Sequence, residues 1–135
     1  EFRRVLFRSN YTFNDLKKIG IEQNKRLEKK IKNAGNYIIS DTCLLDLEIW
    51  SEVKFKKIDK ELKSFSDNEE YDLYFLCKPD IPWEADPLRE NPFNRPYLFK
   101  CFKKKLKEKK KNFYVLEGNL VDRINSSLEI ILNYR

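Results

Sequence analysis

The 135-residue chain has the length of one domain, and 41% hydrophobic and 14% aromatic residues are too many for a disordered chain, although 37% of residues are charged. Histidine is absent, which excludes histidine-based acid–base catalysis, histidine metal ligands and catalytic triads from this chain. Three widely spaced cysteines indicate reduced packing residues of a cytoplasmic protein rather than a disulfide framework. We expect neither a membrane span nor a signal peptide, because no apolar stretch is long enough.

Residues 1–9, EFRRVLFRS, match codon for codon the translation of a common sequencing-library adapter, GAG TTC AGA CGT GTG CTC TTC CGA TCT. We therefore expect this segment to be an artefact and base the fold on residues 10–135. Without its one glutamate and three arginines, the net charge falls by two, from +6 to +4. We also expect the natural sequence to continue upstream of Asn10.

From residue 12 onwards, helical and strand patterns alternate. Residues 12–34 carry apolar side chains at helical spacing, with Thr12 and Asp15 as a capping box at the start and Gly35 as a stop signal. Residues 36–40, NYIIS, form a short apolar run that predicts a buried strand. The later elements follow the same patterns: a helix over 42–55, one or two helical turns within 56–70, a strand over 71–77, a helix over 96–110, a strand over 112–118 and a helix over 119–134, with Asn119 as its N-cap.

Short apolar strands that alternate with helices predict an α/β fold, with a parallel sheet flanked by helices. In open parallel sheets, ligands bind beyond the carboxyl ends of the strands. Asp41 follows the first predicted strand and is placed to hold Mg²⁺, directly or through water, as phosphoryl transfer requires. The alternative, favoured by the motif alone, is that Asp41 or Thr42 caps the next helix.

The connection over residues 79–96 holds all five prolines of the chain. Arg89 and Arg95 offer planar forks suited to phosphate oxygens, and Trp83 offers a flat face for a ring. Arginine is informative because the chain has 20 lysines against 8 arginines, three of which lie in residues 1–9. The residues alone leave open a second interpretation, a surface loop whose arginines pair with its own acids, Glu84, Asp86 and Glu90.

Three further features have a functional and an ordinary interpretation. The EGNL junction at 117–120 could border a nucleotide base, but an ordinary turn is favoured. The basic run from Lys100 to Lys111 invites a nucleic-acid interpretation, but a solvated helix face is favoured. Trp50 lies near the apolar face of its helix, so packing is its default role and ligand stacking the alternative.

Three segments carry a resemblance to a known family: ISDTCLLDLEIWSEVKF, YDLYFLCKPDIPWEADPLRENPFNR and NFYVLEGNLVDRI. Together they resemble the ATPase/kinase domain of NadR-like proteins, the nicotinamide riboside kinases of the P-loop kinase superfamily. The PW-x-x-D-x-LR-x-N pattern is the most distinctive part, and the resemblance covers residues 11–134. It implies a P-loop kinase fold, ATP and Mg²⁺ as cofactors, and transfer of the γ-phosphoryl group to the ribose 5′-hydroxyl of nicotinamide riboside.

The resemblance also assigns roles to individual residues. It implies that Asp41 lies near Mg²⁺ and the phosphates, and that Arg89 and Arg95 are lid arginines that close over the triphosphate. The lid is then the connection 79–96, whose closure excludes water. The resemblance also places Trp50 and Trp83 near the nucleoside pocket. We further expect Asp86 to contact the nucleoside, and Gly118 and Asn119 of the EGNL junction to contact the nucleotide.

The chain departs from this family at two places. Its glycines are Gly20, Gly35 and Gly118, and none begins the phosphate-binding sequence G-x-x-x-x-G-K-[ST]. Cys43 stands where the family has a second aspartate. We expect the missing motif and its central strand to lie upstream of Asn10, and residues 10–135 to be inactive alone. The alternatives are a regulatory ATPase or GTPase of the same fold, or a non-enzymatic basic module that binds nucleic acid.

Overall fold

The computed structural model describes residues 11–82 and 95–134. The chain forms two compact units, one ending at Glu70 and the other beginning at Tyr71, and each is described by itself. Across the described ranges, no helix combines the length and the apolar character needed to cross a membrane.

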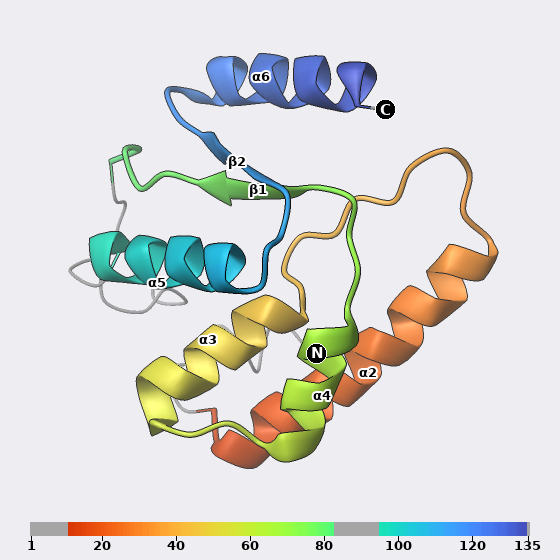
Figure 1. The fold of residues 1–135 in the computed structure, drawn as a ribbon, viewed down its shortest axis with the longest axis vertical. Coiled ribbons are helices and arrows are strands. Elements are labelled where there is room, and N and C mark those ends of the chain that lie inside the picture. Colours follow the sequence, from red (N-terminus) through yellow and green to blue (C-terminus); the bar gives the residue numbers. More distant parts are fainter. Residues whose placement is uncertain (1–10, 83–94, 135) are drawn as a thin grey trace. The chain divides into compact units, whose positions relative to one another are not determined.

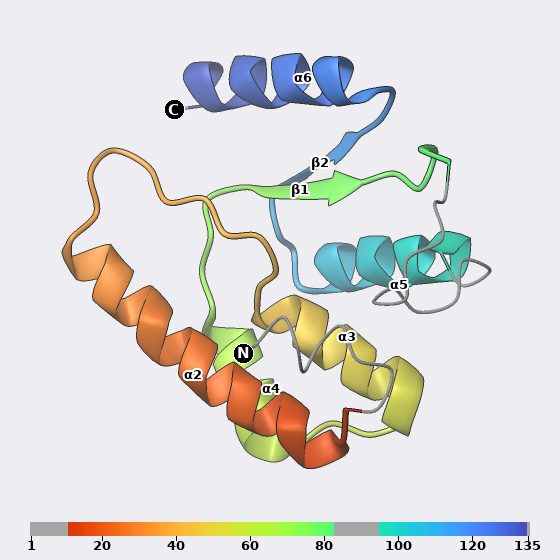
Figure 2. The same ribbon diagram turned by 180° about the vertical axis from the view of Figure 1, so that it is seen from behind.

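The first unit consists of three helices that pack against one another, α2 (Phe13–Lys32), α3 (Leu44–Phe55) and α4 (Lys60–Asn68) (Figures 1 and 2). The predicted capping box starts α2. The Thr12 N–H donates to Asp15 Oδ2 at 2.7 Å, and the Asp15 N–H donates to Thr12 Oγ1 at 3.2 Å. Asp59 caps α4 in a similar way, since its carboxylate accepts from the Glu61 and Leu62 N–H groups. The helix expected over 12–34 is confirmed, and 56–70 holds the short helix α4.

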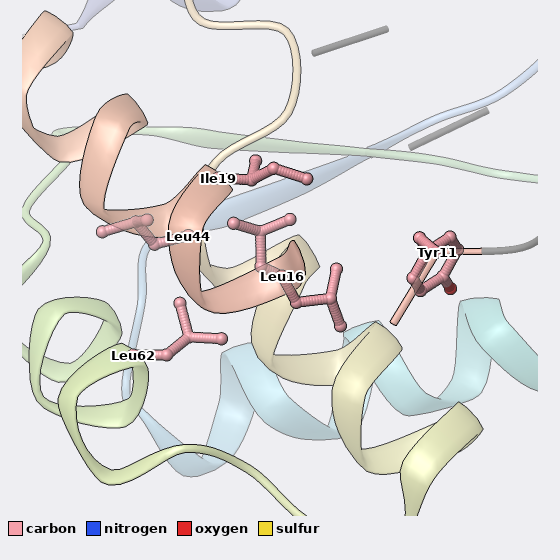
Figure 3. Packing of buried hydrophobic residues seen from close by; sticks show 6 residues of the cluster. Tyr11, Leu16, Ile19, Leu44 and Leu62 are labelled. Carbon is pink, nitrogen blue, oxygen red and sulfur yellow. The ribbon is translucent and has the colours of Figure 1, made fainter. Parts of the chain in front are cut away.

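The core of this unit lies where the three helices meet. Its buried side chains pack as Figure 3 shows, with each helix contributing at least one leucine: Tyr11, Leu16, Ile19, Leu44, Leu47 and Leu62. Helices α2 and α4 approach closely at Gly20, where a Cβ atom would lie 2.5 Å from Leu62 Cδ1. This contact explains why a residue without a side chain occupies the middle of α2.

A buried carboxylate joins α3 to α4. Glu48 is fully buried, and its Oε2 accepts from Ser66 Oγ at 2.5 Å while its Oε1 accepts from Lys63 Nζ at 2.8 Å. A buried charge without partners would be costly, so these two donors make the position tolerable for a carboxylate.

The buried strand expected over 36–40 is wrong. In the described structure this segment is irregular and pairs with no strand, and Tyr37 and Ile39 are 65% and 83% exposed. An apolar run becomes a buried strand only when neighbouring strands take up its N–H and C=O groups and other elements cover both faces. Neither condition is met for this segment among the described residues.

The second unit is built on two parallel strands, β1 (Tyr74–Cys77) and β2 (Phe113–Leu116), with Tyr74 opposite Phe113 and Cys77 opposite Leu116. Helix α5 (Arg95–Glu108) contacts β1, and helix α6 (Leu120–Asn133) contacts β2. Figure 1 shows these two helices on opposite sides of the strand pair. The expected order of strand, helix, strand and helix is therefore confirmed from residue 71 onwards.

The α/β prediction is correct in kind, but the described residues form a smaller sheet than expected: two strands where the sequence predicted three. The predicted apolar face of α6 is also poorly covered. Leu120, Ile124 and Leu128 are 68%, 49% and 51% exposed, whereas Arg123 of the same helix is buried. The apolar spacing therefore predicted the helix correctly, but it did not predict that Arg123 is the buried side chain.

Candidate functional site

The candidate site lies at the carboxyl ends of β1 and β2. Because the two strands are parallel and Cys77 lies opposite Leu116, the chain leaves both strands at the same edge of the sheet. The ladder continues one residue further, since the Lys78 N–H donates to the Leu116 carbonyl at 2.8 Å. The beginning of the 79–96 connection therefore lies beside the EGNL junction, although the two segments are far apart in the sequence.

Arg123, in the first turn of α6, fastens these two exits together. Its Nε–H donates to the Gly118 carbonyl and one of its NH₂ groups donates to the Lys78 carbonyl, both at 2.9 Å. The same guanidinium forms an ion pair with the Asp80 carboxylate. Only the planar fork of an arginine presents several donors in fixed directions to acceptors on two segments. We call Lys78, Asp80, Gly118 and Arg123 the exit clasp.

Asp80 completes the exit clasp from the other side. Its Oδ2 accepts from the Gly118 N–H at 2.8 Å. That hydrogen bond, and then the positive charges of Arg123 and Lys78, hold the pKa of Asp80 below its ordinary value, against the opposing effect of desolvation. Asp80 is therefore an anion at neutral pH, as the ion pair requires.

Gly118 and Asn119 have the backbone geometry of a turn that starts a helix. Gly118 has φ of +87°, a left-handed conformation, and a Cβ atom there would lie 2.6 Å from Asp122 Oδ2. Asn119 is the N-cap of α6, as predicted: its Oδ1 accepts from the Asp122 N–H at 2.9 Å, and Asp122 Oδ2 accepts from the Asn119 N–H at 3.1 Å. The ordinary turn favoured from the sequence is present, and it lies within the exit clasp.

The predicted lid is described only at its ends. Arg95, the first residue of α5, donates from its guanidinium to the Ile81 carbonyl at 2.7 Å, so the two ends of the connection lie close together. The side chains of Trp83, Asp86 and Arg89, all predicted site residues, lie outside the described residues. Arg95 is therefore the predicted lid arginine whose position is known.

Asp41 lies in the first unit, just before α3, and is exposed. It does not cap α3, and neither does Thr42, which has φ of +71°. The N-cap is Cys43, whose N–H donates to Asp46 Oδ2 at 2.7 Å. The capping alternative weighed for Asp41 and Thr42 is therefore wrong, because the helix begins one residue further along the chain.

Three titratable groups surround the start of α3. Burial, with the charges of Asp46 and Glu69, raises the pKa of the Cys43 thiol well above its ordinary value, so this cysteine is a neutral, unreactive thiol. Burial also raises the pKa of Asp46, and the neighbouring Asp41 charge adds to the effect. Glu69 accepts from the Leu44 N–H at 3.1 Å, and burial raises its pKa as well. These groups stabilise the helix start and are poor metal ligands because their charged forms are disfavoured.

Trp50 packs against the core of the first unit and remains partly exposed. This agrees with packing, the default role expected from its position near the apolar helix face. The cysteines fit the packing expectation only in part, since Cys43 and Cys101 are half-buried but Cys77 is exposed.

A magnesium ion is bound through oxygen ligands such as carboxylates. Among them, no group of three or more histidine, cysteine or acidic side chains is arranged to hold a metal ion. Magnesium in phosphoryl-transfer sites is commonly held by one or two carboxylates, waters and the substrate phosphates. The exposed carboxylate of Asp41 fits that limited requirement, whereas the buried Asp46 and Glu69 do not.

A family model described as an AAA domain matches residues 6–123. The chain belongs to this AAA domain family. The match spans both units, including the helix start after Asp41, the exit clasp and the whole 79–96 connection. No curated protein and no solved structure matches this AAA domain. Because the family is of the P-loop NTPase type, it indicates nucleotide binding with ATPase or kinase-like chemistry.

Sequence reasoning missed two of the residues that organise this site, Asp80 and Arg123. Asp80 is the second residue of the 79–96 connection, where the sequence pointed to Trp83, Arg89 and Arg95 instead. Arg123 had a usable signal, because it is one of few arginines in a lysine-rich chain and follows the EGNL junction by three residues. One helical turn after a strand exit, a side chain of that length reaches back to the exit.

Proposed function

We propose that this AAA domain is part of an ATP-dependent nucleoside kinase that phosphorylates the ribose 5′-hydroxyl of nicotinamide riboside. The AAA family match over residues 6–123 carries the nucleotide-dependent part of the proposal. The acceptor rests on the resemblance described above, most of all on the PW-x-x-D-x-LR-x-N pattern within residues 82–91.

The site geometry supports a lid hinged at the exit clasp. Both ends of the 79–96 connection are held, one by Asp80 in the exit clasp and the other by the bond from Arg95 to the Ile81 carbonyl. A connection with fixed ends and a proline-rich middle has fewer open conformations, which lowers the entropic cost of closing it over a ligand. In this proposal Arg89 and Arg95 stabilise negative charge on the transferring phosphoryl group.

The other proposed contacts involve the magnesium ion, the nucleotide and the nucleoside. Asp41 would hold the magnesium ion, which neutralises charge on the β- and γ-phosphate oxygens when it is bound. Gly118 and Asn119 would border the nucleotide base, at an exit that Arg123 keeps in place. Trp50, Trp83 and Asp86 would contact the nucleoside. The phosphate-binding loop is proposed to lie upstream of Asn10, so we expect residues 10–135 alone to have no kinase activity.

The test begins with the source DNA upstream of the Asn10 codon, so that the protein can be made from its natural reading frame. We expect this protein, supplied with ATP and Mg²⁺, to convert nicotinamide riboside to its mononucleotide. Mass spectrometry of the product measures this conversion. Arg95→Met should lower kcat by about 100-fold or more if this arginine stabilises the transition state. Arg26→Met is the matched control, because Arg26 lies on α2 in an exposed pair with Glu22 at 3.4 Å.

A regulatory ATPase is the second candidate, because the AAA domain description applies to it equally well. It predicts ATP hydrolysis whose rate does not depend on any added nucleoside. A kinase predicts the opposite, phosphorylated nucleoside in proportion to ADP. ATP hydrolysis that is unchanged by nicotinamide riboside and by a panel of other nucleosides would contradict the kinase proposal.

A further inference from the structure

The positive charge of the chain is concentrated in one segment, residues 100–111. This segment contains eight lysines and one glutamate, a net charge of +7, whereas the whole chain has a net charge of +6. The remainder of the chain is therefore slightly acidic. Such concentration on one element produces a local positive potential that attracts polyanions.

Helix α5 presents part of this charge as an exposed stripe. Lys100, Lys104 and Lys107 are exposed and follow one another at spacings of four and three residues, so they lie on one side of the helix. Lys110 is exposed two residues beyond the helix end, where its backbone is left-handed, and it adds a fourth charge near that end of α5. Lys104 has a long ion pair of 3.8 Å with Glu108, both side chains being largely exposed, so this acid screens the stripe only weakly. We call Lys100, Lys104, Lys107 and Lys110 the lysine stripe.

The opposite side of α5 is used for packing. Leu106 is buried, and three further residues of this side are half-buried: Leu98, Cys101 and Phe102. The helix contacts strand β1 of the same unit. A helix that inserts into a membrane surface needs a free apolar face in addition to its basic face. Because the apolar side of α5 is used for packing within its own unit, the charge pattern favours a polyanion in solution over a lipid surface.

We propose that the lysine stripe binds the phosphate backbone of double-stranded nucleic acid without sequence preference. Lysine ammonium groups act as point charges towards phosphates, and residues 100–111 contain no arginine, the side chain that most often reads guanine edges. From Lys100 to Lys107 the helix rises about 10 Å, over which a duplex presents roughly six phosphate charges. The inference does not depend on the proposed kinase activity.

Binding of the full chain to a fluorescent 20-base-pair DNA of arbitrary sequence, measured from 50 to 200 mM NaCl, tests this proposal. With about four phosphate contacts, the association constant should fall about 100-fold over that range. The triple variant Lys100→Gln, Lys104→Gln, Lys107→Gln removes three of these contacts, so its association constant should fall only about 4-fold over the same range. A duplex of unrelated sequence should bind the parent as tightly as the first one does.

Helix α2 offers a matched control. Lys25, Lys29 and Lys32 are also exposed at spacings of four and three residues, but two acids, Glu22 and Glu28, lie among the basic residues of that helix. Their triple glutamine variant changes the net charge by the same amount. It should keep the salt dependence of the parent, and circular dichroism should show the same helix content in both variants.

Three results would overturn the proposal. The first is absence of duplex binding at 50 mM NaCl. The second is an equal loss of binding in the α2 control, which would mean that only overall charge matters. The third is tighter binding of the parent to vesicles with 30% phosphatidylserine than to the duplex, which would assign the lysine stripe to a lipid surface.

Discussion

Replacing Arg123 with methionine removes the charge and all the donors at the centre of the exit clasp while keeping a long, unbranched side chain. The guanidinium donates to the Lys78 and Gly118 carbonyls, both at 2.9 Å, and orients Asp80, which in turn accepts from the Gly118 N–H. The substitution should therefore loosen the contact between the two strand exits without opening a cavity in the helix.

The expected magnitude follows from the two carbonyl bonds. Because the donor is a charged guanidinium, each bond contributes about 1.5 to 3 kcal/mol net, so their loss should cost the clasp about 3 to 6 kcal/mol. Since each 1.36 kcal/mol is tenfold in an equilibrium constant, the clasp should open about 150 to 25,000 times more often.

Amide hydrogen exchange of Gly118, followed by NMR spectroscopy, measures this opening directly, because that N–H donates to Asp80 inside the clasp. Lys78→Met is the matched control: it removes one positive charge and the exposed Lys78–Glu117 pair, with N···O 3.0 Å, and should change exchange only slightly. Arg123→Lys should raise the exchange rate of the Gly118 amide nearly as much as Arg123→Met does, because one ammonium group cannot donate to acceptors on both segments. Equal exchange rates at Gly118 in Arg123→Met and the control would refute this account of the clasp.

Three further predictions concern single side chains. Leu47→Ala should lower the unfolding free energy of the first unit by about 2 to 5 kcal/mol, because Leu47 is fully buried in its core. Urea unfolding, followed by Trp50 fluorescence in a Trp83→Phe background, measures this loss. A loss under about 1 kcal/mol would contradict the packing described. Gly118→Ala should cost about 1 to 2 kcal/mol, since φ there is +87°, and thermal unfolding at matched pH measures it. Burial raises the pKa of Asp46 in the folded protein. The contribution of Asp46 to stability is therefore complete below its unfolded-state pKa of 3.8 and is lost as pH rises through its folded-state pKa. The unfolding free energy of Asp46→Asn should decline less with pH above 3.8 than that of the parent, and parallel profiles would count against the burial of this carboxyl group.

Much of the helical structure could be predicted because its signals are local. The Thr12–Asp15 capping box and the Asn119 N-cap depend on residues three apart, and both are present as predicted. The same holds for the strands at 74–77 and 113–116, where apolar runs are bounded by polar turns. Residues 36–40 have a similar local pattern but pair with no strand among the described residues, because pairing depends on a partner that local sequence does not specify.

The two strand exits at the candidate site were predictable from the sequence, but the contacts between them were not. The rule that ligands bind beyond the carboxyl ends of parallel strands directed attention to Gly118, Asn119 and the connection after Cys77. It did not identify Arg123, which is buried in the structure. A buried arginine is stable there because acceptors from two exits surround it, and that arrangement exists only after the strands have paired.

The sequence by itself determined the helices, the two strands, the concentration of positive charge at residues 100–111 and membership of the AAA domain family, because each is a property of residues near one another along the chain or of the pattern as a whole. Only the tertiary structure decided which apolar faces are covered, where the cap of α3 lies, and that Asp80, Gly118 and Arg123 form one clasp. The clasp depends on backbone carbonyls and N–H groups that parallel pairing brings within 3 Å of a side chain some 40 residues away.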